Sequence, residues 1–163
     1  MANIEEHRVR EADFERLVSP LVGLPITHAW RGYGSAIFFE LGPLKRVRRD
    51  RRPGHSLKGV ATVMLEGNWR IERRQSIEFG ADSSDRRITN RLRKTKRLLV
   101  ESVTLEGRLP ELRIGLSEGR WVSSFMTFEG QPRWVLFLPD TSWLCVSRGR
   151  VIREAAAPVL HSS

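Results

Sequence analysis

The chain has 163 residues, of which 40% are hydrophobic, with five tryptophans and a formal net charge of +9. This length suits one domain with a sizeable core, and the composition excludes a wholly disordered chain. No window approaches 18 continuous apolar residues and no apolar run follows Met1, so we expect neither a membrane span nor a signal peptide. Cys145 is the only cysteine. An intrachain disulfide is therefore excluded, and the cytoplasm is the expected compartment.

The positive charge is concentrated in two segments. Residues 45–58 and 86–97 each hold seven Lys or Arg residues, and together they contain one acidic residue, Asp50. The rest of the chain has 14 basic against 18 acidic residues. The sequence therefore describes a mildly acidic domain that carries two basic patches.

An N-terminal region over 1–20 is expected to be helical. The pattern predicts an amphipathic helix over 3–18, with Asn3 as N-cap and with Phe14, Leu17 and Val18 on its apolar side. Ser19-Pro20 would end this helix.

Residues 21–80 are expected to form a first β half. Strands over 26–30 and 35–41, closed on Gly32-Tyr33, would place His28 opposite Ile37. The basic segment 45–58 contains Pro53-Gly54 without an apolar period, which predicts a mobile loop. Residues 60–65 and 69–73 then predict another hairpin.

A basic amphipathic helix is predicted over 84–97, capped by Asp82, Ser83 or Ser84. Its inward positions would be Ile88, Leu92, Thr95 and Leu99, which follow the spacing of one helix face. Arg86, Arg93 and Arg97 would then point away from the core, with Arg87 and Lys94 on one flank.

In the second β half, 98–153, apolar residues alternate with polar ones between turns, which predicts an antiparallel meander. Residues 154–163 would form a tail. A two-residue Glu118-Gly119 loop pairs Leu116 with Trp121 and Leu112 with Phe125. A three-residue loop from Ser117 shifts the pairing by one and reverses every side chain. The register of the two-residue loop places more apolar side chains on a single face of the sheet, so we prefer it. We therefore expect a core face made of Leu112, Ile114, Leu116, Trp121, Phe125, Trp134, Leu136, Leu138, Trp143 and Cys145.

Together these elements predict a single α+β, mainly β domain over 1–163. We expect an antiparallel sheet of about eight strands, folded into a sandwich or partly open barrel. The N-terminal helix would cover an edge, and the second helix would lie between the two β halves.

Three stretches, LVGLPITHAWRGYGSAIFFELG (21–42), GRLPELRI (107–114) and SFMTFEGQPRWVLF (124–137), resemble those of small bacterial proteins grouped as a domain of unknown function. The resemblance implies a bacterial, cytoplasmic, single-domain protein and carries no activity. Some small β-rich families of this appearance are toxin-immunity proteins, which makes that class a rival interpretation.

Catalytic and metal chemistry have weak support in the sequence. Cys145 lies in the apolar run Leu144-Cys145-Val146, which indicates a buried and inert thiol. His28 lies between apolar residues, and the four histidines show no metal-binding spacing. We expect no cofactor and no metal. An enzyme with a site near His28 remains the third interpretation.

The basic patches have the stronger case. Like charges four residues apart on a helix repel one another, so a polyanion partner would explain them, although a solubilising surface is the simpler alternative. We predict a non-catalytic binding module for a nucleic-acid backbone. The rival is a protein-interaction module of immunity or adaptor type with an acidic partner. The predicted contact residues are Arg46, Arg48, Arg49, Arg51, Arg52, Arg86, Arg87, Arg93, Lys94 and Arg97.

Overall fold

The computed structural model describes residues 4–49 and 53–156. Within these ranges the elements, in chain order, are β1 (Ile4–Arg8), α1 (Glu11–Val18), the 3-10 turn η1 (Ser19–Leu21), β2 (Ile26–Arg31), β3 (Ile37–Leu41), β4 (Lys45–Arg48), β5 (His55–Lys58), β6 (Ala61–Leu65), β7 (Asn68–Arg73), β8 (Ser76–Gly80), α2 (Asp85–Arg93), β9 (Val100–Glu106), β10 (Glu111–Leu116), β11 (Arg120–Phe125), β12 (Trp134–Phe137), β13 (Trp143–Ser147) and β14 (Arg150–Ala156).

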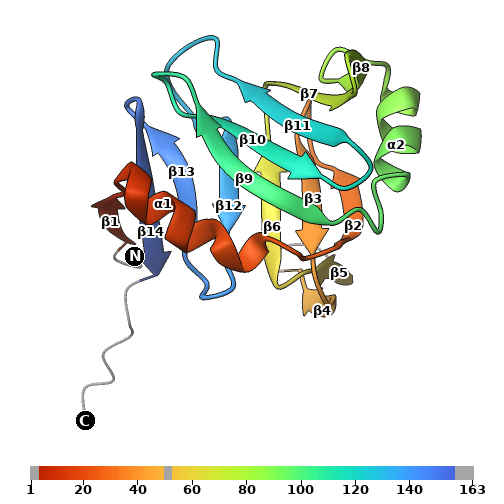
Figure 1. The fold of residues 1–163 in the computed structure, drawn as a ribbon. Coiled ribbons are helices and arrows are strands. Elements are labelled where there is room, and N and C mark those ends of the chain that lie inside the picture. Colours follow the sequence, from red (N-terminus) through yellow and green to blue (C-terminus); the bar gives the residue numbers. More distant parts are fainter. Residues whose placement is uncertain (1–3, 50–52, 157–163) are drawn as a thin grey trace.

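Two large antiparallel sheets face one another (Figure 1). The first has seven strands in the order β1-β14-β13-β12-β6-β3-β2, and the second has five in the order β8-β7-β11-β10-β9. Each sheet takes strands from both sides of α2 in the sequence. The strands β4 and β5 belong to neither sheet and form a separate two-stranded ribbon.

The inner faces of both sheets contribute to one hydrophobic core. Trp134 of β12 is completely buried in it. Its Nε1 donates to the carbonyl of Pro110, just before β10, at 2.9 Å, and its ring meets the edge of Phe14 from α1 at 6.4 Å. Trp134 therefore links the seven-stranded sheet to α1 and to the residue that precedes β10 in the other sheet.

The predicted fold class is confirmed. The chain is mainly β with antiparallel sheets, α1 lies near the N-terminus, and α2 lies between the two β halves. The strand number differs, because the described residues form fourteen strands where about eight were expected. No helix in the described part of the chain is long and apolar enough to cross a membrane.

The preferred register of the β10–β11 hairpin is wrong. Leu116 pairs with Arg120 and Gly115 with Trp121, so the connection is the three-residue loop 117–119, with Glu118 and Gly119 both at positive φ. Trp121 and Phe125 consequently lie on the outer face of the five-stranded sheet. There the Arg113 and Arg70 guanidiniums stack on their rings at 4.7 and 4.6 Å.

The predicted continuation of the meander is also wrong, because β11 and β12 are not neighbours. β11 pairs with β10 and β7, whereas β12 pairs with β13 and β6 in the other sheet. Trp143 pairs with Phe137 and Cys145 with Val135, which places them on the outer face of the seven-stranded sheet. Leu136 and Leu138 do lie in the core.

Three further expectations are corrected near the first β half. Residues 4–8 form a strand that pairs with β14, so the first helix begins only at Glu11, and Asn3 lies outside the described residues. β6 and β7 do not form a hairpin, because the chain crosses from one sheet to the other between them. β2 and β3 enclose a five-residue connection, which puts His28 opposite Glu40 rather than Ile37.

The second helix is shorter than predicted. Ser84 caps it by accepting a hydrogen bond from the Arg87 amide, and α2 then ends at Arg93. The Thr95 hydroxyl donates to the Leu92 carbonyl at 2.6 Å, and the Arg97 amide donates to the Ile26 carbonyl at 2.7 Å. Because the chain turns here to pair with β2, Leu98 enters the core and Leu99 is exposed.

The register can be tested by comparing two substitutions. Leu136→Ala should lower the free energy of unfolding by about 2–5 kcal/mol, because Leu136 is fully buried. Phe125→Ala should lower it by only about 1–2 kcal/mol, since its ring is half-buried beneath Arg70. Urea unfolding of both variants measures the difference, and equal losses would contradict the outward position of Phe125.

Candidate nucleic-acid interface

The described parts of the basic segment, 45–49 and 53–58, contain the two paired strands of a β-ribbon, where composition predicted a mobile loop. Lys45 pairs with Lys58 and Arg48 with His55, and the Arg49 amide donates to the Gly54 carbonyl at the turn. Side chains alternate between the faces of a strand. Arg46 and Arg48 therefore share one face, with Leu57 and His55 across from them. Both arginine side chains are exposed.

Two strands alone are only marginally stable in water, so the anchoring of this ribbon matters. The Gly59 amide donates to Glu40 Oε2 at 3.0 Å, and the Val60 amide donates to the Leu41 carbonyl at 2.9 Å. The Lys58 ammonium lies 5.6 Å from the centre of the Phe137 ring. The ribbon is thus attached to the seven-stranded sheet at its base.

The outer surface of α2 and the turn after it carry the second group of cations. Arg86, Arg93, Lys94 and Arg97 are all exposed. None of the four makes an ion pair with a described residue. Arg87 differs from them, because its Nη2 donates to the Glu78 carbonyl at 2.7 Å.

Glu78 of β8 ties α2 to the five-stranded sheet. Its carboxylate accepts from Arg120 Nε at 3.0 Å and lies 3.5 Å from Arg91 Nη1. Burial works against the charge of Arg120, but its hydrogen bonds to Glu78 and Glu118 outweigh that effect and raise the pKa of the guanidinium above its usual value. Arg87 and Arg91 therefore hold the helix in place, and no feature of the sequence singled out Glu78 for this role.

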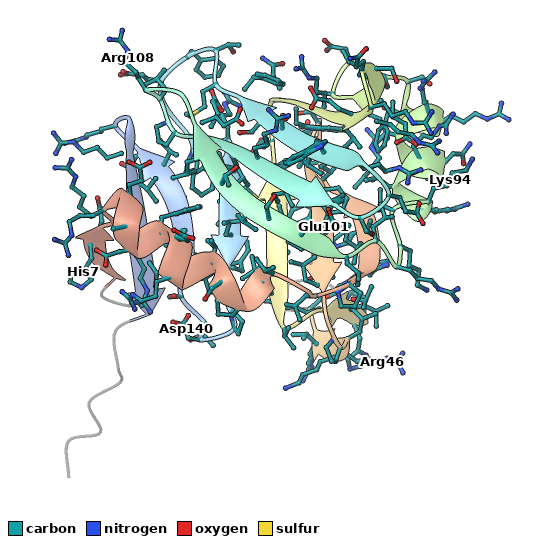
Figure 2. The ribbon with its side chains drawn as sticks, viewed as in Figure 1. His7, Arg46, Lys94, Glu101, Arg108 and Asp140 are labelled. Atoms are coloured by element: carbon teal, nitrogen blue, oxygen red, sulfur yellow. The ribbon has the colours of Figure 1, made fainter. Side chains whose placement is uncertain are left out.

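Backbone hydrogen bonds bring the turn after α2 and the base of the ribbon to the same end of β2 and β3. Arg97 N donates to the Ile26 carbonyl at 2.7 Å, Gly42 N to the Pro25 carbonyl at 2.9 Å, and Val60 N to the Leu41 carbonyl at 2.9 Å. The turn after α2 and the base of the ribbon are thus linked through one short set of contacts. Figure 2 shows Lys94 and Arg46 on the same side of the molecule.

We call this surface the basic corner and define it by the exposed predicted residues Arg46, Arg48, Arg49, Arg86, Arg93, Lys94 and Arg97. Arg87 borders it, with part of its hydrogen-bonding capacity already used. Arg51 and Arg52 lie outside the described residues. The corner combines segments about forty residues apart in the chain.

His28 faces a carboxylate that the sequence analysis did not pair with it. It lies opposite Glu40 across β2 and β3, although no hydrogen bond joins the two side chains. Glu40 is buried and accepts from Trp30 Nε1 at 3.3 Å, from Gly59 N at 3.0 Å and from Thr62 Oγ1 at 2.6 Å. Structural contacts therefore occupy this carboxylate. Across the described ranges, no three His, Cys, Asp or Glu side chains gather to hold a metal ion.

Cys145 is buried in a small apolar cluster with Val135 and Ile152 on the outer face of the seven-stranded sheet. Burial, together with the nearby negative charges of Glu154 and Glu6, raises the pKa of the thiol to about 11. A thiol with this pKa is protonated at neutral pH, and the thiolate is the nucleophilic form. The geometry agrees with a structural cysteine.

The chain matches no family model, no curated protein and no solved structure. The resemblance described from the sequence stays an expectation.

Cys145 allows a pH-dependent test of this assignment. In the folded protein at pH 8, about one thiol in a thousand should be ionised, so labelling by a thiol reagent should be slow and should accelerate as pH rises toward 11. In urea the same thiol should react rapidly, because it regains its ordinary pKa. Rapid labelling of the folded protein at pH 8 would contradict the structural role and return Cys145 to the candidate nucleophiles.

Proposed function

We propose that the basic corner binds the sugar-phosphate backbone of nucleic acid, and that the protein is a non-catalytic binding module. One observation carries the proposal. Seven exposed cations come from two distant segments that approach one another where the turn after α2 meets the base of the ribbon, and none has an acidic partner among the described residues. Two described acids near α2, Glu78 and Asp85, are paired instead with Arg120 and Arg31.

Stability does not account for these cations. Arg93 and Arg97 lie beyond the helix residues that reach the core, and clustered like charges repel. Arginine predominates over lysine in the corner, and its planar guanidinium can donate two parallel hydrogen bonds to one phosphate. A polyanion would remove the repulsion by neutralising several charges at once.

The shapes of the two segments also suit a duplex. A two-stranded β-ribbon and an α-helix are both elements that the major groove of B-DNA admits, and that groove is about 12 Å wide. Ribbon strands of four residues are about 13 Å long. The corner lacks a base-reading motif, so binding should be largely independent of sequence.

We place this function in the bacterial cytoplasm, on the strength of the single reduced thiol and the resemblance noted above. The rival function is a protein-interaction module whose acidic partner would use the same corner. It differs from the first in one measurable respect, since nuclease treatment would leave an acidic protein partner bound. An enzyme near His28 is less supported, because Glu40 is engaged by three donors.

Salt dependence measures the proposed contacts directly. Anisotropy titration of a labelled 20-base-pair duplex at 50–300 mM salt should give micromolar affinity. The slope of log K against log salt should be about −4 to −5 if five phosphates are neutralised. Replacing Arg86, Arg93 and Arg97 by Gln should flatten the slope by about 2–3. Replacing Arg46, Arg48 and Arg49 by Gln should act in the same direction.

A matched control separates the corner from overall charge. Arg73, Arg108 and Arg150 are exposed and without a described ion pair, so their replacement by Gln removes the same net charge from other surfaces. This control should keep the wild-type slope. The proposal fails if the wild-type protein does not bind at 50 mM salt, or if the corner and control variants lose the same slope.

A further inference from the structure

A groove separates α1 from β9 on a surface distinct from the basic corner. Its volume is about 410 Å³. Its apolar walls come from Phe14 and Val18 on the helix and from Val103 and Leu105 on the strand. Figure 1 shows α1 running beside β9, and Figure 2 places Glu101 on that strand. The groove therefore combines a helix face with one border of a sheet.

That border is an open strand edge. β9 is the last strand of the five-stranded sheet, with β10 on one side only. Its first residue is covered, because Gly23 N donates to the Val100 carbonyl at 2.7 Å and Val100 N donates to the Leu24 carbonyl at 2.9 Å. Over 101–106 no strand of the described ranges lies on the other side. An uncovered edge of this kind is where an extended peptide can add as a further strand.

The charge around the groove selects one kind of peptide. Glu11, Glu15 and Glu101 line it and are exposed, and none of them makes an ion pair with a described residue. No Lys or Arg lines the groove, although the chain carries 28 of them and a net charge of +9. Charge and apolar walls together are complementary to a segment that combines basic and apolar side chains.

We propose that this groove binds an extended, Lys- or Arg-containing segment of a partner protein, which adds to β9 as a strand. About six residues would be accommodated, because 101–106 spans roughly 20 Å in extended conformation. Glu11 and Glu15 line the groove from the same helix as Phe14 and Val18, so a Lys or Arg side chain directed toward α1 would pack its aliphatic stem on the apolar residues and reach a carboxylate with its charged end. This site is independent of the basic corner and takes a partner of the opposite charge.

The probe is a fluorescein-labelled eight-residue peptide of alternating Lys and Val. We expect saturable binding at 50 mM salt that weakens as salt rises, and no binding of the matched Glu–Val peptide. Because the protein carries a net charge of +9, non-specific attraction would favour the acidic peptide instead. A Lys–Val peptide N-methylated at alternate residues should not bind, since it lacks the backbone donors that pair with β9.

Substitution locates the site. Replacing Glu11, Glu15 and Glu101 by Gln should weaken the Lys–Val peptide at least tenfold at 50 mM salt. The control variant replaces Glu6 and Glu129 by Gln and Asp82 by Asn, which are exposed acids outside the groove, and should bind like the wild type. Amide NMR shifts caused by the peptide should concentrate at 101–106.

Four results would overturn the proposal. They are no binding of the Lys–Val peptide, equal binding of the N-methylated peptide, shifts that lie away from 101–106, or equal losses in the groove and control variants. Duplex binding should be unaffected by the groove substitutions. The failure of one site therefore leaves the other interpretable.

Discussion

The inner faces of the two sheets bury one shared apolar interior, and the rest of the structure depends on this burial. Trp134 is completely buried in it, contacts Phe14 of α1, and donates a hydrogen bond to the Pro110 carbonyl just before β10. α1 contributes Phe14 and Val18 to the interior, and α2 contributes Ile88 and Leu92. Burial of apolar surface is the dominant favourable contribution to folding, so each helix presents its apolar face to this interior and its charged face to water.

The distribution of charge follows from the same constraint. The ribbon β4–β5 carries three cations on β4 and Lys58 at the end of β5. It lies outside the two large sheets and is joined to the seven-stranded one through Gly59, Val60 and Lys58. On α2 the cations that contact Glu78 secure the helix, and those facing away remain without acidic partners. Acidic side chains instead border the groove at β9. In the two proposals, a polyanion and a basic peptide segment would therefore occupy separate surfaces and could bind together.

The errors of the sequence interpretation have identifiable physical causes. A two-residue loop and a three-residue loop both fit Ser117-Glu118-Gly119. A shift of one residue in the pairing moves every side chain of the strand to the other face of the sheet. Trp121 and Phe125 were therefore assigned to the wrong face. Stacked guanidiniums from Arg113 and Arg70 shield those rings outside the core, which an apolar pattern does not reveal. The basic segment shows no regular spacing of apolar residues because the strands of its ribbon belong to neither large sheet and are mostly exposed to solvent.

The sequence by itself determined the mainly β class, the buried positions Ile88 and Leu92 of the second helix, and the existence of two basic segments, and it limited the cap of that helix to Asp82, Ser83 or Ser84. These features depend on local alternation, turn chemistry and composition, which neighbouring residues specify. Tertiary structure decided which strands pair, the crossing between sheets after Leu65 and after Phe125, the pairing of His28 with Glu40, the basic corner and the groove at β9. Each of these features depends on contacts between residues far apart in the chain. Those contacts form because together they bury the shared apolar core, and a local sequence pattern does not specify them.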